Sequence, residues 1–237
     1  MKFTCSAPRI LWQLPCLFVI IMGSVFAQEA NVKLQFVSFP IASDDSPVEL
    51  LIGDGETIEV ELPTSGISKT FTVPALTSWV LGKSSVDEEG KFKFETYGKA
   101  PSIGSGSQLI LVLRKGNNNA LGFKLIPMTN EQRGFNGGKY FLFNATKAEI
   151  AGYIGTKKTG RFALKPMSHT LISPAPSETK RGNKICHAKF FYRMDETTRP
   201  FFSSNWRFSE NARTMVFIYH APDTGHIKLH TIRDYVQ

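Results

Sequence analysis

The sequence predicts an all-β protein, an antiparallel β-sandwich of the immunoglobulin-like or a related type, with little or no helix. Apolar and polar residues alternate with period two in runs such as Val32–Phe36 and Ile58–Leu62, as expected for half-buried strands. Gly, Pro and Asn interrupt these runs at near-regular intervals, which is typical of turns between strands. The 19 phenylalanines also favour a pleated, half-buried surface.

The first 27 residues have the features of a cleavable signal peptide. Lys2 and Arg9 precede an apolar run, and Val25-Phe26-Ala27 supplies the small or short-branched residues that signal peptidase requires. Cleavage after Ala27 predicts an exported protein, periplasmic or secreted. The apolar run has about 16 residues, fewer than the ~20 that a spanning helix needs, so an uncleaved N-terminal membrane anchor is the alternative.

Cleavage also changes the charge and the cysteine content. The 28 basic residues become 26 against 20 acidic ones, so the net charge falls from +8 to +6. Cys5 and Cys16 leave with the signal peptide, so Cys186 is the remaining thiol and no internal disulfide can form. Cys186 shares a strand face with Ala188 and Phe190, which predicts that its thiol is buried and inert.

The strands of the first half follow from alternation and turn signals. Asp54-Gly55 gives the strongest hairpin signal there. The continuous apolar run Leu109–Leu113 predicts a central strand covered on both faces. Phe92 and Phe94 are expected to face inward. The strands expected in this half are Val32–Phe36, Val48–Gly53, Glu56–Leu62, Lys69–Val73, Ser78–Gly82, Lys91–Tyr97, Leu109–Leu113 and Leu121–Ile126.

The second half is predicted to be a β-meander that ends in a hairpin around Pro222–Gly225. In that hairpin, Met215, Phe217 and Tyr219 are expected to pack with two residues of the last strand, Ile227 and Leu229. No internal repeat is evident. The strands expected in this half are Lys139–Phe143, Glu149–Ile154, Arg161–Leu164, His169–Ile172, Ile185–Met194, Arg213–His220 and His226–Ile232.

The domain organisation follows from the length and the polar gaps. A signal peptide, 1–27, is expected before one sandwich domain, 28–237. The alternative is two small β domains, 28–128 and 138–237, joined by the polar loop 129–137. Asn144-Ala145-Thr146 matches a glycosylation sequon, although its position after a strand also suits an Asn turn.

Catalytic and metal motifs are absent from the sequence. No G-x-S-x-G elbow, HExxH or CxxC occurs, so the protein is predicted not to be an enzyme and no cofactor is expected. The best metal candidates are His220, His226 and His230, which would share one face if His220 paired with His226 across the last hairpin. No recognised spacing supplies a third ligand, so surface histidines are the preferred interpretation.

Basic residues form the most suggestive pattern. In a folded meander they could make one patch that attracts polyanions such as acidic glycans, although lysines on strand edges also serve to block aberrant pairing. A nucleic-acid partner is not expected in an exported protein without a recognisable nucleic-acid-binding module. The basic residues are Lys157, Lys158, Arg161, Lys165, Lys180, Arg181 and Lys184.

Three functional hypotheses remain. The first is an exported, non-catalytic structural or binding module of the cell envelope or extracellular space, with an envelope protein or an anionic glycan as its partner. The second is an extracytoplasmic protein that binds anionic glycans or surfaces through the basic patch. The third is a hydrolase whose site is assembled from residues far apart in the sequence. A membrane is a partner only if the signal segment stays uncleaved.

Overall fold

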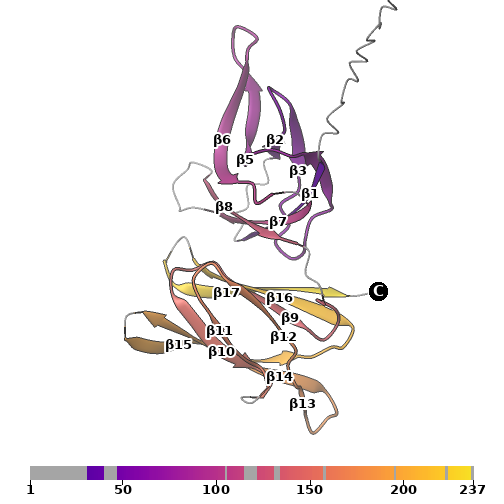
Figure 1. The fold of residues 1–237 in the computed structure, drawn as a ribbon, viewed down its shortest axis with the longest axis vertical. Coiled ribbons are helices and arrows are strands. Elements are labelled where there is room, and N and C mark those ends of the chain that lie inside the picture. Colours follow the sequence, from indigo (N-terminus) through magenta and orange to yellow (C-terminus); the bar gives the residue numbers. More distant parts are fainter. Residues whose placement is uncertain are drawn as a thin grey trace, which may run out of the picture.

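The protein is built entirely of strands and turns over the residues that the structure describes. The structure is a computed structural model, and it describes residues 31–39, 47–104, 106–114, 122–130, 134–156, 159–194, 196–221 and 224–235. These residues form four sheets and no helix, which confirms the all-β sandwich class (Figure 1). Nowhere in these ranges is there a helix with the length and apolarity that crossing a bilayer requires. The predicted signal peptide lies outside them.

The N-terminal half is a sandwich of two four-stranded sheets. Sheet A has the strand order β4-β1-β7-β8, and sheet B has the order β3-β2-β5-β6. Their strands are β1 (Asn31–Phe39), β2 (Val48–Leu51), β3 (Thr57–Val60), β4 (Phe71–Pro74), β5 (Ser78–Val86), β6 (Phe92–Pro101), β7 (Gly106–Arg114) and β8 (Phe123–Thr129).

The C-terminal half is a second sandwich. Sheet C has the order β12-β9-β16-β17, and sheet D has the order β11-β10-β14-β13, with β15 on the other edge of β14. Their strands are β9 (Tyr140–Asn144), β10 (Glu149–Ile154), β11 (Arg161–Leu164), β12 (His169–Ile172), β13 (Ser177–Glu178), β14 (Lys184–Met194), β15 (Thr197–Arg207), β16 (Ala212–His220) and β17 (Ile227–Tyr235).

The two halves repeat one topology, which the sequence did not reveal. Strands β1 to β8 correspond in order to β9, β10, β11, β12, β14, β15, β16 and β17, and only β13 has no counterpart. Both inner sheets contain the same parallel pair, β1 with β7 and β9 with β16, among otherwise antiparallel neighbours. Two sandwiches with the same unusual strand order indicate an internal duplication.

A β-bulge fixes the residue-by-residue correspondence between the halves. In the β5–β6 pair the register shifts after Leu81, so that the strand pairing skips Tyr97. In the β14–β15 pair it shifts after Phe190, so that Phe201 has no partner. Tyr97 is buried in the core of its half and Phe201 packs against the core of the other, so both bulges insert an aromatic side chain at the same place.

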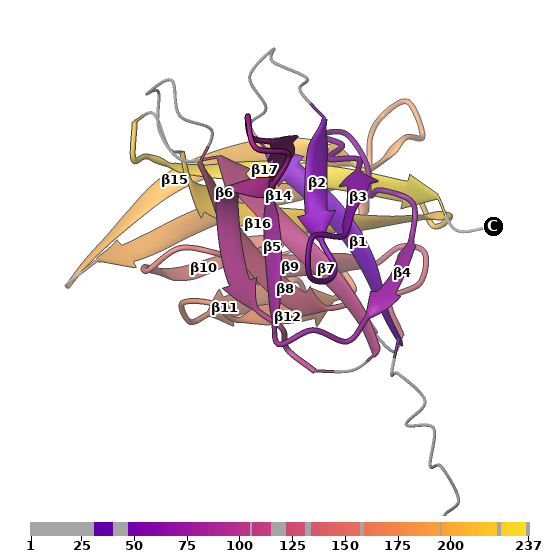
Figure 2. The same cartoon turned by 90° about the horizontal axis from the view of Figure 1, so that it is seen from above.

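Three apolar clusters lie between four stacked sheets in the order B, A, C, D. The first cluster lies between sheets B and A, the second between A and C, and the third between C and D. Figure 1 shows the N-terminal half above the C-terminal half, and Figure 2 shows sheet B lying over the other layers. Sheets A and C are therefore covered on both faces. This explains the continuous apolar run Leu109–Leu113, whose residues alternate between the first and second clusters, as predicted.

Two predicted packing arrangements are wrong. Phe92, 45% exposed, and the half-buried Phe94 do not enter the core, because the β5–β6 hairpin extends beyond the sandwich (Figure 1). Met215, Phe217 and Tyr219 lie in the cluster between sheets A and C, whereas the residues expected to pack with them, Ile227 and Leu229, face the cluster between C and D. The register of the hairpin sets this difference, because Phe217 pairs with His230 and the side chains of successive residues alternate between the faces.

The sequence pattern also missed strands β13 and β15. Strand β15 contains Pro200 and the run Ser203-Ser204-Asn205, which are not typical of a strand interior. It lies at the edge of sheet D, where proline is tolerated because one side of the strand makes no ladder hydrogen bonds.

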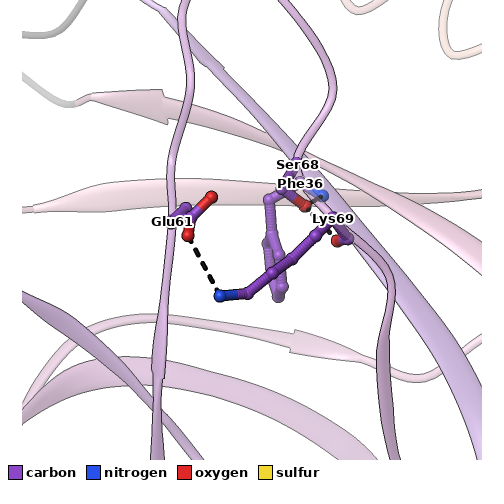
Figure 3. Close-up of polar contacts among 4 residues, drawn as sticks. All are labelled: Phe36, Glu61, Ser68 and Lys69. Carbon is purple, nitrogen blue, oxygen red and sulfur yellow. Dashed lines mark hydrogen bonds and ion pairs between the residues drawn. The ribbon is translucent and has the colours of Figure 1, made fainter.

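The chain between β3 and β4 is fixed to β1 by Ser68, which is buried (Figure 3). Its hydroxyl accepts a hydrogen bond from Phe36 N and donates one to Lys69 O, both at 2.8 Å. Lys69 Nζ forms an ion pair with Glu61 at 3.0 Å and lies 5.4 Å from the ring centroid of Phe71. These contacts position the preceding residues, Gly66 and Ile67, at the edge of the cluster between sheets A and C.

The residue of the predicted glycosylation sequon is buried. Asn144 has no exposed surface, and its amide nitrogen donates to Ala148 O at 2.8 Å and to Lys165 O at 3.0 Å. Its oxygen accepts hydrogen bonds from Thr146 N and Oγ1, at 3.0 and 2.7 Å. The folded chain therefore leaves no room for a glycan on this nitrogen, and Asn144 acts as the turn residue that the sequence offered as the other interpretation. Ser38 holds the corresponding place in the first half, where its hydroxyl donates to Leu62 O.

Candidate functional site

The outer face of sheet D is a sheet surface that no other layer of the described structure covers. Along β14, Cys186, Ala188 and Phe190 point into the core, so the residues between them point outward. The neighbouring strands continue this surface on both sides of β14. The fold thus presents side chains from four strands on one face, which we call the D face.

One row of the D face crosses the sheet through Arg161, Tyr153 and Lys189, which are direct partners on β11, β10 and β14. The ring of Tyr153 lies 5.8 Å from that of His187, centroid to centroid. His187 donates from Nδ1 to Asn205 Oδ1 at 2.9 Å, which fixes its ring on the face. This part of the surface combines two basic groups with two ring systems.

The next row contains Ala163, Ala151 and Phe191. The Lys189 ammonium lies 5.3 Å from the centroid of the Phe191 ring, so the cation and the ring form one unit. The two alanines are exposed and short, and beside them the surface has a hollow of about 400 Å³. Lys165, Phe191, Arg193 and Glu149 are among the residues that line it.

The charge on the D face is strongly positive. Five basic side chains, Arg161, Lys165, Lys189, Arg193 and Arg207, lie on it or at its border. Glu149, the direct partner of Arg193, is the one carboxylate among the described outward positions of these strands. A surface with this excess of cations attracts anionic polymers.

The corresponding face of sheet B has different chemistry. Aligned through the bulges, Ala151, Ala163 and Phe191 correspond to Glu49, Glu59 and Gly82. The pKa of the Glu49 carboxyl lies below its usual value, first because the Ser84 side chain donates a hydrogen bond to it. The row of the D face with two alanines and Phe191 is therefore specific to the second half and is not a general consequence of the fold.

The structure brings only some of the predicted basic residues together. Arg161 lies on the D face and Lys165 borders its hollow. Lys180 and Arg181 are exposed in the turn between β13 and β14, and Lys184 is ~17 Å along β14 from Lys189 at the usual strand rise. Lys157 and Lys158 lie outside the described residues. Their role in binding a polyanion stays a prediction.

Lys184 forms an ion pair with Glu210 at 2.6 Å. This contact raises the pKa of the Lys184 ammonium and lowers that of the Glu210 carboxyl, through the hydrogen bond first and the charge second. Because its charge is already paired within the chain, Lys184 is less available to a ligand than Arg161 and Lys189 of the D face.

The three candidate histidines do not converge. His220 pairs with Ile227 rather than His226, and its Nδ1 donates to Gly225 O at 2.9 Å. His230 lies on the opposite face of sheet C, stacked on Phe39 at 4.3 Å. Across the described ranges, no group of three or more His, Cys, Asp or Glu residues has metal-binding geometry.

The single thiol of residues 28–237, Cys186, is fully buried, as predicted. Burial raises the pKa of this thiol to about 11, and the hydrogen bond with Tyr140 lowers it by less. Burial likewise raises the pKa of Tyr140 to about 12. Both groups are therefore neutral at physiological pH, which is consistent with a structural role.

Sequence reasoning missed three basic residues of the D face as site candidates: Lys189, Arg193 and Arg207. The alternation of β14 already placed Lys189 and Arg193 on one side of a strand. Nothing in the sequence placed them next to Arg161, because strand pairing brings the two segments together.

Comparison with protein-family models and with characterised proteins gave no match to this chain. The D face therefore has to be interpreted from its own chemistry.

Proposed function

We propose that this protein is an exported, non-catalytic binding module that holds an anionic glycan on the D face. The observation that carries this proposal is the combination of five basic side chains with Tyr153, His187 and Phe191 on one face of sheet D. Guanidinium groups bind carboxylates and sulfates in bidentate geometry. Aromatic rings supply rigid apolar surface against which the C–H faces of sugar rings can pack.

The dimensions of the face favour a polymer over a small anion. Arg161 and Lys189 are two strands apart, ~9.6 Å at the usual strand spacing, and this is close to the ~8 Å Debye length at physiological ionic strength. The two cations act as separate charges in solution, and because of the distance between them a ligand has to extend along this row to contact both. A chain with a charge on successive sugar units meets this requirement.

Titration of the full chain with polygalacturonate, a polymer of uronic acids, tests the proposal, with neutral dextran as the comparison polymer. The charge reversals Arg161→Glu and Lys189→Glu should each weaken binding about tenfold or more, since each removes a charge-assisted hydrogen bond. Lys99→Glu is the matched control, because Lys99 is exposed on the outward side of sheet B and the net charge changes equally. Lys99→Glu should change the affinity less than twofold.

Two further variants separate a glycan from any other polyanion. Tyr153→Ala should weaken polygalacturonate but leave inorganic polyphosphate unaffected, because only a sugar ring packs against the aromatic ring. Ala151→Glu, which copies Glu49 of the first half, should weaken both polymers by placing a carboxylate at the hollow. The proposal fails if the full chain does not bind polygalacturonate, or if Lys99→Glu weakens binding as much as Lys189→Glu.

A further inference from the structure

The hairpin of β5 and β6 exposes an apolar surface at the end of the molecule opposite sheet D (Figure 1). Its strands continue beyond the sandwich, so that Val86 and its direct partner Phe92 are 70% and 45% exposed. Phe94 lies two residues further along the same face, and its ring centroid is 6.3 Å from that of Phe92. Apolar side chains that are exposed side by side, rather than scattered, are typical of an interaction surface.

The turn of this hairpin is acidic. Asp87, Glu88 and Glu89 follow one another and all three are exposed. The Asp87 carboxylate accepts hydrogen bonds from the backbone nitrogens of Glu89 and Lys91, at 3.0 and 2.8 Å, which fixes the turn. Glu89 is paired with Lys91, whereas Glu88 makes no ion pair within the part of the chain that the structure describes. The hairpin therefore joins an apolar face to a negatively charged tip.

The hollow of the D face has the complementary properties. Its apolar part consists of the short side chains Ala151 and Ala163 and the Phe191 ring, and its volume is about 400 Å³. The charged groups around it are three basic side chains and one carboxylate, Lys165, Lys189 and Arg193 against Glu149. An apolar centre with opposite charge on the two sides is the pattern of a specific protein–protein contact.

The hairpin and the D face of one chain cannot meet. Sheets A and C lie between sheet B, which carries the hairpin, and sheet D. Because the two surfaces lie at opposite ends of the molecule (Figure 1), a second copy can present its hairpin to the D face of the first and leave its own D face free for a third. A contact of this kind is heterologous and generates an open series of copies unless it closes into a ring.

We propose that the β5–β6 hairpin of one copy docks on the D face of a second copy, with Phe92 in the hollow and Glu88 against its basic border. A second copy is the occupant because both complementary surfaces belong to this chain and cannot meet within it. The contact does not depend on glycan binding, although a glycan and a hairpin compete for the same face. Its experiments therefore contain no glycan, and failure of glycan binding leaves their result unchanged.

Analytical ultracentrifugation tests the contact with the chain from Gln28 onward, so that the apolar run of the predicted signal peptide takes no part. A single hairpin gives a small and therefore weak interface, so the protein should be followed from about 10 μM to about 1 mM. The average mass should rise with concentration beyond that of a dimer and should fall at high salt, which screens exposed charges. A chain that stays monomeric, stops at a dimer, or associates equally at low and high salt would overturn the proposal.

Two variants establish which surfaces meet. Phe92→Ala removes the aromatic anchor and Ala151→Glu fills the hollow with a carboxylate, so each should weaken self-association at least about tenfold. An equimolar mixture should nevertheless form a 1:1 dimer, because the intact hairpin of the Ala151→Glu chain can dock on the intact D face of the Phe92→Ala chain. Misfolded variants cannot complement each other in this way. Absence of the mixed dimer would refute the pairing of hairpin and hollow.

Matched controls make the same changes elsewhere. Tyr235 is 65% exposed at the end of β17, and Thr72 is exposed on β4, so neither lies on the hairpin or on the D face. Tyr235→Ala and Thr72→Glu should each change the association constant less than about twofold, since residues outside a contact contribute little to it. Weakening by either control that equals the effect of the corresponding variant would place the contact elsewhere and overturn the proposal.

Discussion

Replacing Phe217 by Ala is expected to destabilise both halves of the protein together. Phe217 is fully buried between sheets A and C, and its ring lies 5.6 Å from that of Phe39 in the N-terminal half. Removal of a buried phenylalanine ring costs about 3–5 kcal/mol, through the lost apolar contacts and the cavity left behind. For a chain of this length each kcal/mol lowers Tm by about 2–4 °C, so Tm should fall by about 10 °C.

The sequence provides one reporter for each half. Trp79 is buried in the cluster between sheets A and B, and Trp206 packs against the cluster between C and D. In the chain from Gln28 onward, Trp206→Phe leaves Trp79 as the only tryptophan, and Trp79→Phe leaves Trp206. Fluorescence during heating then follows each half separately. Because the halves share an apolar interface, both reporters should give one Tm, and Phe217→Ala should lower both by the same amount.

Phe92→Ala is the matched control, because the same atoms are removed from a side chain that is 45% exposed on the β5–β6 hairpin. It should lower Tm by less than about 3 °C, since surface substitutions usually change stability by less than about 0.5 kcal/mol. If Phe217→Ala lowers only the Trp206 transition, or if the two reporters melt more than about 5 °C apart, the interface between sheets A and C does not couple the halves.

Four further predictions concern single features of the fold. Asn144→Ala should lower the free energy of unfolding in urea by about 3 kcal/mol, because it leaves buried hydrogen-bonding groups without partners; an effect below 1 kcal/mol would contradict the burial of this residue. Burial lowers the pKa of His230, with a smaller opposing effect from its hydrogen bond to a backbone carbonyl, so the folded state binds fewer protons than the unfolded state. Stability should therefore be complete above pH 6.5 and decrease as the pH falls from 6.5 toward the lower folded pKa, and His230→Gln should remove this part of the pH dependence. Cys186 should react with a thiol reagent at pH 8 only at the rate of unfolding, since its raised pKa and its burial both oppose attack; rapid labelling of the native protein would show otherwise. Deletion of residues 212–237 removes both β16 and β17 from sheet C and should give an insoluble product, so a soluble truncation with an unchanged melting transition would contradict the proposed core.

Local patterns in the sequence predicted the class of the fold and most of its strands. Alternation placed Val32, Leu34 and Phe36 on one buried face, and all three are fully buried. The unbroken run Leu109–Leu113 correctly indicated a strand covered on both sides. These predictions succeed because the alternation of side chains along a strand is a local property. Burial of one face of a strand requires an apolar residue at every second position, and this pattern can be read from the sequence.

The sequence patterns failed where the outcome depends on pairing between distant segments. Phe92 stands at an apolar position of an alternating run, as a core residue would. It is nevertheless exposed, because the β5–β6 hairpin extends beyond the sandwich. The bulge residues Tyr97 and Phe201 look unremarkable in the sequence, although together they reveal the duplication.

Sequence patterns were therefore enough to predict a β-sandwich protein and the inward-facing residues of most strands. The packing of two equivalent sandwiches through sheets A and C, and the meeting of Arg161 with Lys189 on the D face, became visible in the folded chain. The physical reason is that a strand pattern specifies which face is buried but not which partner covers it. The partner is chosen by register and by the fit of whole sheets, and these involve residues that lie far apart in the chain.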